Sequence, residues 1–395
     1  MKKVQRTILL GLSAALLGGL VGAVSAGFLH FIEWGQELLW KVLTLNLPLQ
    51  ALLICTLGGL LVGLCQKYLG NHPQGITEAI TTLRKTGRLE YQHLPHGLTT
   101  ASISLIFGAS LGPEAAIMDL IGGLGTWVGD ILRNLRFRFD LPLSTQPANR
   151  LTKVLRSWPT LTAFAVGAMT FSRVLNGLYS GGLLKLAAPF QWTDLLWSLP
   201  LGLVGAAGGG LYLALQTWTR KLVAPLQRKP ILRGVLGGAA LGLMANFLPL
   251  TLFSGQHLLQ PTYDQAAQLG FWLLLLTALA RLFLTSLLLA TGWKGGQFLP
   301  IMFGGAALGL AMSALFPIIP MPVAALAAMA ALTAVVLPKP LIALVLMALL
   351  FPLQSLRISS VAIGLVIVAK KLLARWQPQS SGLSLDAEIS TPTAA

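Results

Sequence analysis

The stretch Thr291-Gly292-Trp293-Lys294-Gly295-Gly296-Gln297-Phe298-Leu299-Pro300 places a glycine-rich turn directly before an apolar segment. A helix that begins at such a turn has backbone N–H groups without intrahelical partners, and the positive end of its dipole lies at the same place. Both features favour an anion. Inside a bilayer, non-helical backbone is tolerated only where protein buries it or where it lines a watery cavity. The stretch therefore predicts an anion site at a helix start.

An earlier segment has the same design. It reads Phe107-Gly108-Ala109-Ser110-Leu111-Gly112-Pro113-Glu114, and Pro113 suits a first helical turn. Two such breaks in one chain predict a shared ion site.

The composition indicates a polytopic membrane protein, because 55% of the 395 residues are hydrophobic and only 10% are charged. Apolar runs near the spanning length of about 20 residues lie at about 7–32, 48–66, 195–217, 231–250, 269–290 and 355–373. Further runs are short or broken by Gly and Pro, at about 96–108, 112–133, 158–172, 299–317 and 322–350. Full and broken helices together are typical of transport folds with a midplane site.

The net charge of +16 could indicate nucleic-acid binding, but the basic residues lie in short loops between apolar runs rather than on one amphipathic face. The positive-inside rule explains them better, and it places both termini in the cytoplasm. Segments 33–41 and 257–268 carry little positive charge and are expected to face outward. The first apolar run has no convincing cleavage site and is predicted to be a retained span. The segment 377–395 is predicted to be a disordered cytoplasmic tail.

The turn at 291–300 resembles the second filter segment of the CLC family of chloride channels and proton/chloride exchangers, which reads roughly SGxxGGxFxP. Arg281 and Thr285 precede it in a similar R-x-x-x-T pattern, and segment 109–113 matches the family's GxxGP. The resemblance extends from the first span to about Ala374. It implies an all-α membrane fold with a CLC-like inverted repeat, in which residues 1–190 and 191–376 form the two halves and broken helices meet at a midplane anion site.

The family holds its anion on backbone N–H groups, which offset the cost of removing its hydration shell. The resemblance therefore implies an anion-binding filter, in which Gln297, Phe298 and Leu299 are the foremost candidates. The alternative is that the turn only packs two helices. The family's first filter segment, GSGIP, is matched by Pro73-Gln74-Gly75-Ile76-Thr77, in which Gln74 and Thr77 can still donate hydrogen bonds. The complete candidate filter comprises Gln74, Gly75, Ile76, Thr77, Gly112, Gly295, Gly296, Gln297, Phe298 and Leu299.

The family's gating glutamate precedes Gly-Pro, where this chain has Leu111. Glu114 is the only acid nearby, and an acid in a membrane segment is a functional candidate because its charge is expensive to bury. It is therefore a candidate for a displaced gate. Equally, a carboxylate in the first turn of a helix is favoured by the dipole alone.

Two further family positions lack their usual residue. The internal proton-accepting glutamate aligns with Leu184, and the pore tyrosine of a late helix aligns with Pro352, next to Phe351. Proton coupling needs titratable groups along a path, so Leu111 and Leu184 favour passive conduction over exchange.

Two basic residues depart from the family pattern, Lys294 in the filter turn and Arg173 in an apolar segment. Either could raise the local anion concentration through its field. Alternatively, Lys294 snorkels to the headgroups and Arg173 pairs with a carbonyl or with Asp119.

The sequence thus predicts a CLC-like channel for chloride or a similar small anion in a bacterial-type inner membrane, and the resemblance implies a homodimer. Two alternatives stay open, an anion/proton antiporter that uses Glu114 and a CLC-derived membrane protein that no longer conducts. An enzyme is not expected, because the sequence has no metal-ligand cluster, phosphate loop or nucleophile–base arrangement. No cofactor and no nucleic-acid partner is expected either.

Overall fold

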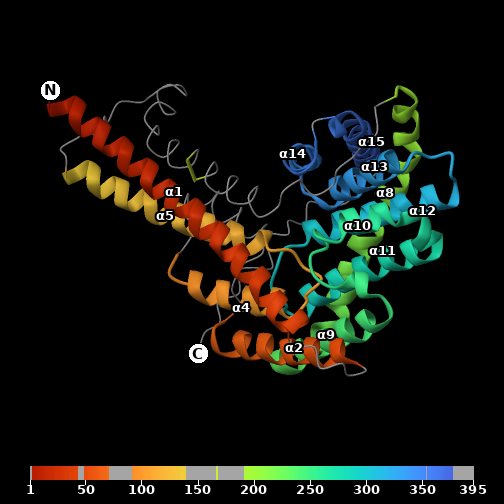
Figure 1. Ribbon diagram of the computed structural model, residues 1–395, viewed down its shortest axis with the longest axis horizontal. Helices are drawn as coiled ribbons and strands as arrows, with labels where there is room; N and C mark the ends of the chain where they lie inside the picture. Colours follow the sequence, from red (N-terminus) through yellow and green to blue (C-terminus); the bar gives the residue numbers. More distant parts are fainter. Residues whose placement is uncertain are drawn as a thin grey trace.

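The computed structural model describes residues 2–42, 49–70, 91–138, 166–167, 191–352 and 354–376. These residues are mainly helical (Figure 1). The first part contains α1 (Lys2–Glu37), its π-helical continuation η1 (Leu38–Val42), α2 (Gln50–Tyr68), α4 (Leu94–Ile106) and α5 (Glu114–Arg138). The second part contains α8 (Thr193–Val223), η2 (Ala224–Leu226), α9 (Pro230–Phe247), η3 (Pro249–Thr251), α10 (Leu259–Asp264), α11 (Ala266–Ala290), α12 (Phe298–Leu315), α13 (Met321–Val336), α14 (Pro340–Leu350) and α15 (Ser355–Trp376).

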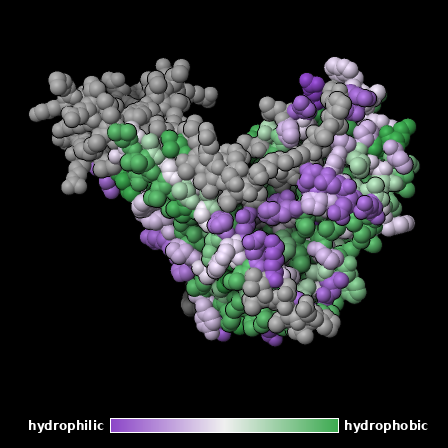
Figure 2. All heavy atoms as spheres, viewed as in Figure 1, coloured by the Kyte–Doolittle hydropathy of each residue, from purple (hydrophilic) through white to green (hydrophobic). Residues whose placement is uncertain are grey.

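Six of these helical segments are long and apolar enough to cross a membrane, namely Gly11–Lys41, Gln50–Tyr68, Thr193–Leu226, Pro230–Phe247, Ala266–Ala290 and Phe298–Leu315. Five coincide with runs predicted to span. The sixth is α12, which was predicted to be short or broken. The predicted run at 355–373 forms α15 but is not among the six, because Arg357, Lys370 and Lys371 interrupt its apolar character. Figure 2 shows hydrophobic side chains over much of the visible surface, as contact with lipid requires.

The most buried helices are α12 and α13, which pack against each other and against α8. Small residues allow this close packing. A Cβ atom at Gly205 of α8 or at Gly309 of α12 would overlap the backbone of α13, at Ala328 and Ala324 respectively. The start of α12 is therefore fixed by a tightly packed surrounding bundle.

One basic residue of α15 has a clear structural role. The Nζ atom of Lys370 donates hydrogen bonds to the carbonyl oxygens of Ala334 at 3.0 Å and Val335 at 2.9 Å. The last carbonyl groups of a helix have no intrahelical partner. Lys370 satisfies those at the end of α13, which explains a charge on a mainly apolar helix.

The first and second parts of the chain meet where α2 and α9 lie antiparallel, side by side (Figure 1). A Cβ atom at Gly59 of α2 would overlap the backbone of Gly234 in α9, so the two helices are in direct backbone contact. On the other side of the first part, α1 runs alongside α5. The two parts also meet where residues 104–112 lie next to residues 294–296.

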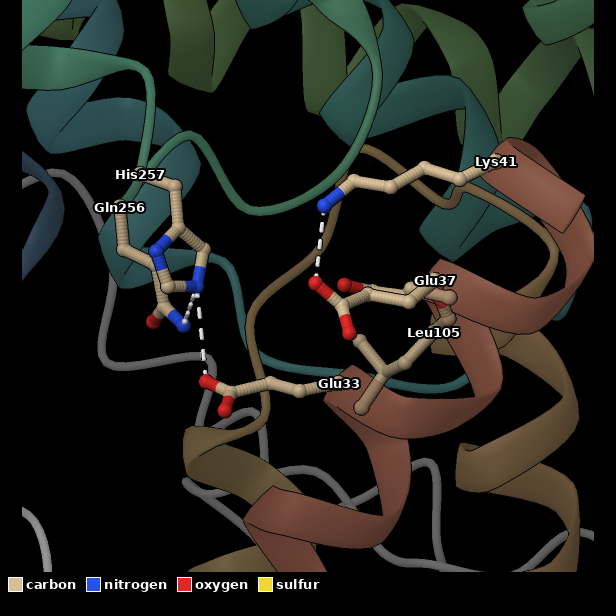
Figure 3. Close-up of polar contacts among 7 residues, drawn as sticks. Glu33, Glu37, Lys41, Leu105, Gln256 and His257 are labelled. Carbon is tan, nitrogen blue, oxygen red and sulfur yellow. Dashed lines mark hydrogen bonds and ion pairs between the residues drawn. The ribbon is translucent and has the colours of Figure 1, made fainter. Parts of the chain in front are cut away.

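The two segments predicted to face outward lie together (Figure 3). The Nε2 atom of His257 lies 3.5 Å from Oε1 of Glu33, and Lys41 pairs with Glu37 on the same helical stretch at 2.8 Å. The two segments therefore share one side of the molecule. That this side faces outward stays a prediction.

The packing of α8 on α13 predicts unequal effects of two substitutions in one helix. Gly205→Leu should lower the melting temperature of the detergent-solubilised protein by roughly 5 °C or more, because its side chain would overlap the backbone of Ala328. The control is Gly210→Leu, since Gly210 is exposed and a Cβ there would meet no described atom within 4 Å. Equal melting temperatures for the two variants would contradict this packing.

Candidate anion site

The two glycine-rich segments are joined by a reciprocal pair of backbone hydrogen bonds. The N–H of Gly112 donates to the carbonyl oxygen of Gly296 at 2.7 Å, and the N–H of Gly296 donates to that of Gly112 at 2.6 Å. Helix α5 begins at Glu114 and α12 begins at Phe298, each two residues after its bonded glycine. The starts of two helices therefore lie side by side, as the two breaks in the sequence predicted.

Three glycines make this approach possible. A Cβ atom at Gly112 or at Gly296 would overlap the carboxylate of Glu114, and one at Gly295 would lie 2.7 Å from Cβ of Leu111. Larger residues at these positions would separate the segments or displace the carboxylate.

The Glu114 carboxylate lies at the start of α12, although Glu114 belongs to α5. Its Oε1 atom accepts a hydrogen bond from the backbone N–H of Leu299 at 2.9 Å, and the amides of Phe298 and of Glu114 itself also interact with the carboxylate. Its Oε2 atom is buried and has no hydrogen-bond partner among the described residues. An acidic side chain of the protein thus occupies the helix start at which an anion would be stabilised.

The position of the family's gating glutamate is filled differently. Leu111 is fully buried and belongs to an apolar cluster that includes Trp293 and Leu288. The only acid at the junction in the described residues is therefore Glu114.

The filter turn is anchored to the helices around it. The backbone N–H of Lys294 donates to Oγ of Ser104 in α4 at 3.0 Å, and Nε1 of Trp293 donates to the carbonyl oxygen of Gly234 in α9 at 3.1 Å. Trp293 is only 1% exposed. The Lys294 side chain is half-buried, and its predicted influence on permeation stays a prediction.

The beginning of the turn has a second anchor. The Nε2 atom of Gln66 in α2 donates to the carbonyl oxygen of Gly292, and Arg233 in α9 donates to Oε1 of the same glutamine. Gly292 has a φ of +90°, which a residue with a side chain rarely adopts. The turn thus follows one path because its own backbone and two neighbouring helices fix it.

The two residues of the R-x-x-x-T pattern support the junction from α11. Thr285 donates through Oγ1 to the carbonyl oxygen of Ser110 at 3.1 Å. Arg281 is fully buried, and its guanidinium group donates to three carbonyl groups and lies 4.1 Å above the ring of Phe303 in α12. The carbonyl oxygens belong to Leu250, Leu252 and Phe253. Arg281 therefore fixes the connection between α9 and α10 against α12.

A tyrosine that the sequence analysis did not select reaches the filter turn. The hydroxyl of Tyr212 in α8 donates to Oε1 of Gln297 at 2.7 Å, and Nε2 of Gln216 lies 3.3 Å from the same oxygen. Tyr212 is fully buried. Phe351, which lies beside the position aligned with the family's pore tyrosine, is buried in the hydrophobic core. The available signal was a tyrosine inside the apolar run at 195–217, but nothing in the sequence relates that run to residue 297.

The structure brings together Gly112, Glu114, Gly295, Gly296, Gln297, Phe298 and Leu299. The candidate Lys294 lies in the same turn. Outside the described residues lie Gln74, Gly75, Ile76 and Thr77 of the first filter segment, with Arg173 and Leu184.

Membrane-length helices, interrupted helices whose starts meet, and a carboxylate at that meeting point define an α-helical ion-transport protein of the membrane. The model of the family described as "Voltage gated chloride channel" matches residues 148–372, more than half of the 395-residue chain. The chain belongs to this CLC family.

Known proteins agree with this assignment. The chain is 26% identical to the "Putative ion-transport protein YfeO" of Salmonella choleraesuis (strain SC-B67), over 94% of this chain and 98% of that protein. Its fold matches the crystal structure of a CLC-type fluoride/proton antiporter, with a TM-score of 0.70 and 18% identity over 93% of this chain and 96% of that one. It also matches a slow cyanobacterial Cl⁻/H⁺ antiporter, with a TM-score of 0.69 and 19% identity over 93% and 99% of the two chains. The predicted family and fold class are confirmed.

The close approach of the two segments gives a test of the junction. Gly296→Leu should abolish anion flux, because its side chain would occupy the space of the Glu114 carboxylate. Gly125→Leu is the control, since Gly125 is an exposed residue of α5 beside which a Cβ atom meets nothing described within 4 Å. The measurement is chloride efflux from liposomes that contain equal amounts of each purified variant. Unchanged efflux through Gly296→Leu would mean that the conducting path lies elsewhere.

Proposed function

We propose that this protein conducts chloride or a similar small inorganic anion down its electrochemical gradient, as an uncoupled CLC-like channel. The observation that carries the proposal is the hydrogen bond from the Leu299 amide to the Glu114 carboxylate. Backbone donors at the start of α12 already hold one negative charge there. The same donors can hold a permeating anion when the carboxylate leaves or is neutralised.

In this proposal Glu114 is the gate. The carboxylate and the anion compete for the amides at the start of α12, because two negative charges close together in a poorly hydrated site repel strongly. The alternative, a carboxylate that only stabilises the start of its own helix, accounts less well for the contact with Leu299 of α12. Gln297, Phe298 and Leu299 supply the binding groups, and Gln74, Gly75, Ile76 and Thr77 are proposed to complete the filter.

Anion/proton exchange is the second candidate. A single titratable group at the anion site could carry a proton in one direction and give way to an anion in the other. Two of the structurally similar proteins are antiporters. Leu111 and Leu184, which replace both acids of the family's proton path, favour the channel.

Several features of the proposal are taken from the resemblance to the CLC family. The protein is proposed to act as a homodimer in a bacterial-type inner membrane, with both termini in the cytoplasm, and to be no enzyme. Lys294 and Arg173 are proposed to attract anions by their positive fields. A non-conducting protein does not need an acidic side chain that is hydrogen-bonded to the start of a second helix. The contact of Glu114 with Leu299 therefore disfavours the non-conducting alternative.

Liposome flux tests the proposal. Purified protein is reconstituted with a chloride gradient, valinomycin sets the voltage, and chloride and proton movements are recorded at acidic and at neutral pH. Chloride efflux without uphill proton movement is expected. Proton movement in fixed ratio to chloride would establish exchange, and the absence of flux for every small anion tested would contradict anion transport.

Replacement of the carboxylate tests the gate. Glu114→Gln should raise chloride flux several-fold at neutral pH and remove its pH dependence, because a neutral amide does not compete as an anion for the start of α12. Asp264→Asn, which changes an exposed acid of α10, is the control and should behave as the wild type. Equal flux and an equal pH profile for Glu114→Gln and the wild type would show that Glu114 only stabilises helices.

A further inference from the structure

The side-chain oxygen of Gln297 is fully occupied by donors from α8. It accepts the hydroxyl of Tyr212 at 2.7 Å and Nε2 of Gln216 at 3.3 Å. An amide oxygen has two lone pairs, so these two donors fill its acceptor capacity. The orientation of the Gln297 amide is therefore fixed by groups on a different helix.

This arrangement determines where the other end of the amide points. The amide group is planar, and its C–O and C–N bonds diverge from the trigonal Cδ. Of the two N–H donors on Nε2, the one trans to the oxygen points opposite to the C–O bond, so with the oxygen directed to Tyr212 this donor is directed away from α8. These donors make no hydrogen bond to another described residue.

The position of Gln297 relates these donors to the anion site. Gln297 directly precedes the first residue of α12. On one side of it, the space next to Gly296 holds the Glu114 carboxylate, and on the other side the Leu299 amide donates to that carboxylate. A carboxylate held by residues on both sides of Gln297 marks this point as one that attracts negative charge.

We propose that Nε2 of Gln297 donates hydrogen bonds to the anion, beside the backbone amides of α12, and that Tyr212 and Gln216 are positioning residues that hold the amide in this orientation. The inference rests on the proposed function and names the side chain that sets its selectivity. A directed neutral donor offsets the desolvation of a strongly hydrated anion such as chloride more than that of a weakly hydrated one such as thiocyanate. It therefore favours chloride relative to thiocyanate.

Selectivity is the readout that separates this role from a merely structural one. Calorimetric binding and liposome flux are measured for chloride and for thiocyanate. Gln297→Leu should lower the chloride/thiocyanate ratio roughly tenfold, because it removes hydrogen bonds to a charged group. Tyr212→Phe keeps the ring and should lower the ratio about threefold, since the donors remain but lose their orientation. Tyr263→Phe in α10 is the matched control and should leave the ratio unchanged.

A double variant tests whether Tyr212 acts through Gln297. In the Gln297→Leu background, Tyr212→Phe should cause no further change in the ratio. Gln297→Glu keeps an acceptor for Tyr212 while it replaces the two donors by a second acidic oxygen, and it should lose chloride binding although its melting temperature stays near that of the wild type.

The outcomes distinguish this inference from the proposed function. If the wild type binds and conducts chloride but Gln297→Leu, Gln297→Glu and Tyr212→Phe keep its selectivity, Gln297 is no ligand and only the inference is overturned. The same holds if Tyr212→Phe shifts the ratio equally in both backgrounds. If the wild type neither binds nor conducts chloride or thiocyanate, the proposed function fails and the inference fails with it.

Discussion

The rest of the site depends on the two hydrogen bonds between Gly112 and Gly296. A helix that begins inside a membrane leaves N–H groups exposed at a depth where water is scarce, and each costs free energy unless it finds a partner. Here two interrupted helices solve part of this problem for each other, because each supplies the donor and the acceptor that the other's turn needs. The reciprocal bonds also hold the starts of α5 and α12 together, so their dipoles act on the same volume.

This junction explains why an acid can remain at such a position. A buried carboxylate is expensive by itself, but the Leu299 amide and two helix dipoles compensate its charge. In the proposed channel, the same compensation is available to a small anion of suitable size.

Sequence reasoning predicted the parts of this arrangement that rest on local rules. The glycine-rich turns, the helix starts after them and the apolar runs follow from backbone freedom and hydrophobicity, which neighbouring residues report. The run at 355–373 was predicted to span although Arg357, Lys370 and Lys371 lie in it, and α12 was counted among the short or broken runs. The role of Lys370 could not be predicted, because the carbonyl groups that it binds belong to another helix. Similarly, the contacts of Gln297 with Tyr212 and of Glu114 with Leu299 join residues 85 and 185 positions apart. No local pattern contains such pairs, and only the packing of α8, α5 and α12 creates them.

The anchoring of the filter turn limits how the protein can move. Helices α2, α4 and α9 each hold a different point of residues 292–294, and α11 holds the segment opposite through Thr285. A hinge or rocking motion of these helices against one another would break several of these bonds at once. In the proposed channel, passage of an ion is then left to rotations of single side chains, which take place in picoseconds to nanoseconds, whereas domain motions take microseconds to milliseconds. The proposal thus implies that turnover is limited by binding and release of the ion rather than by rearrangement of the fold.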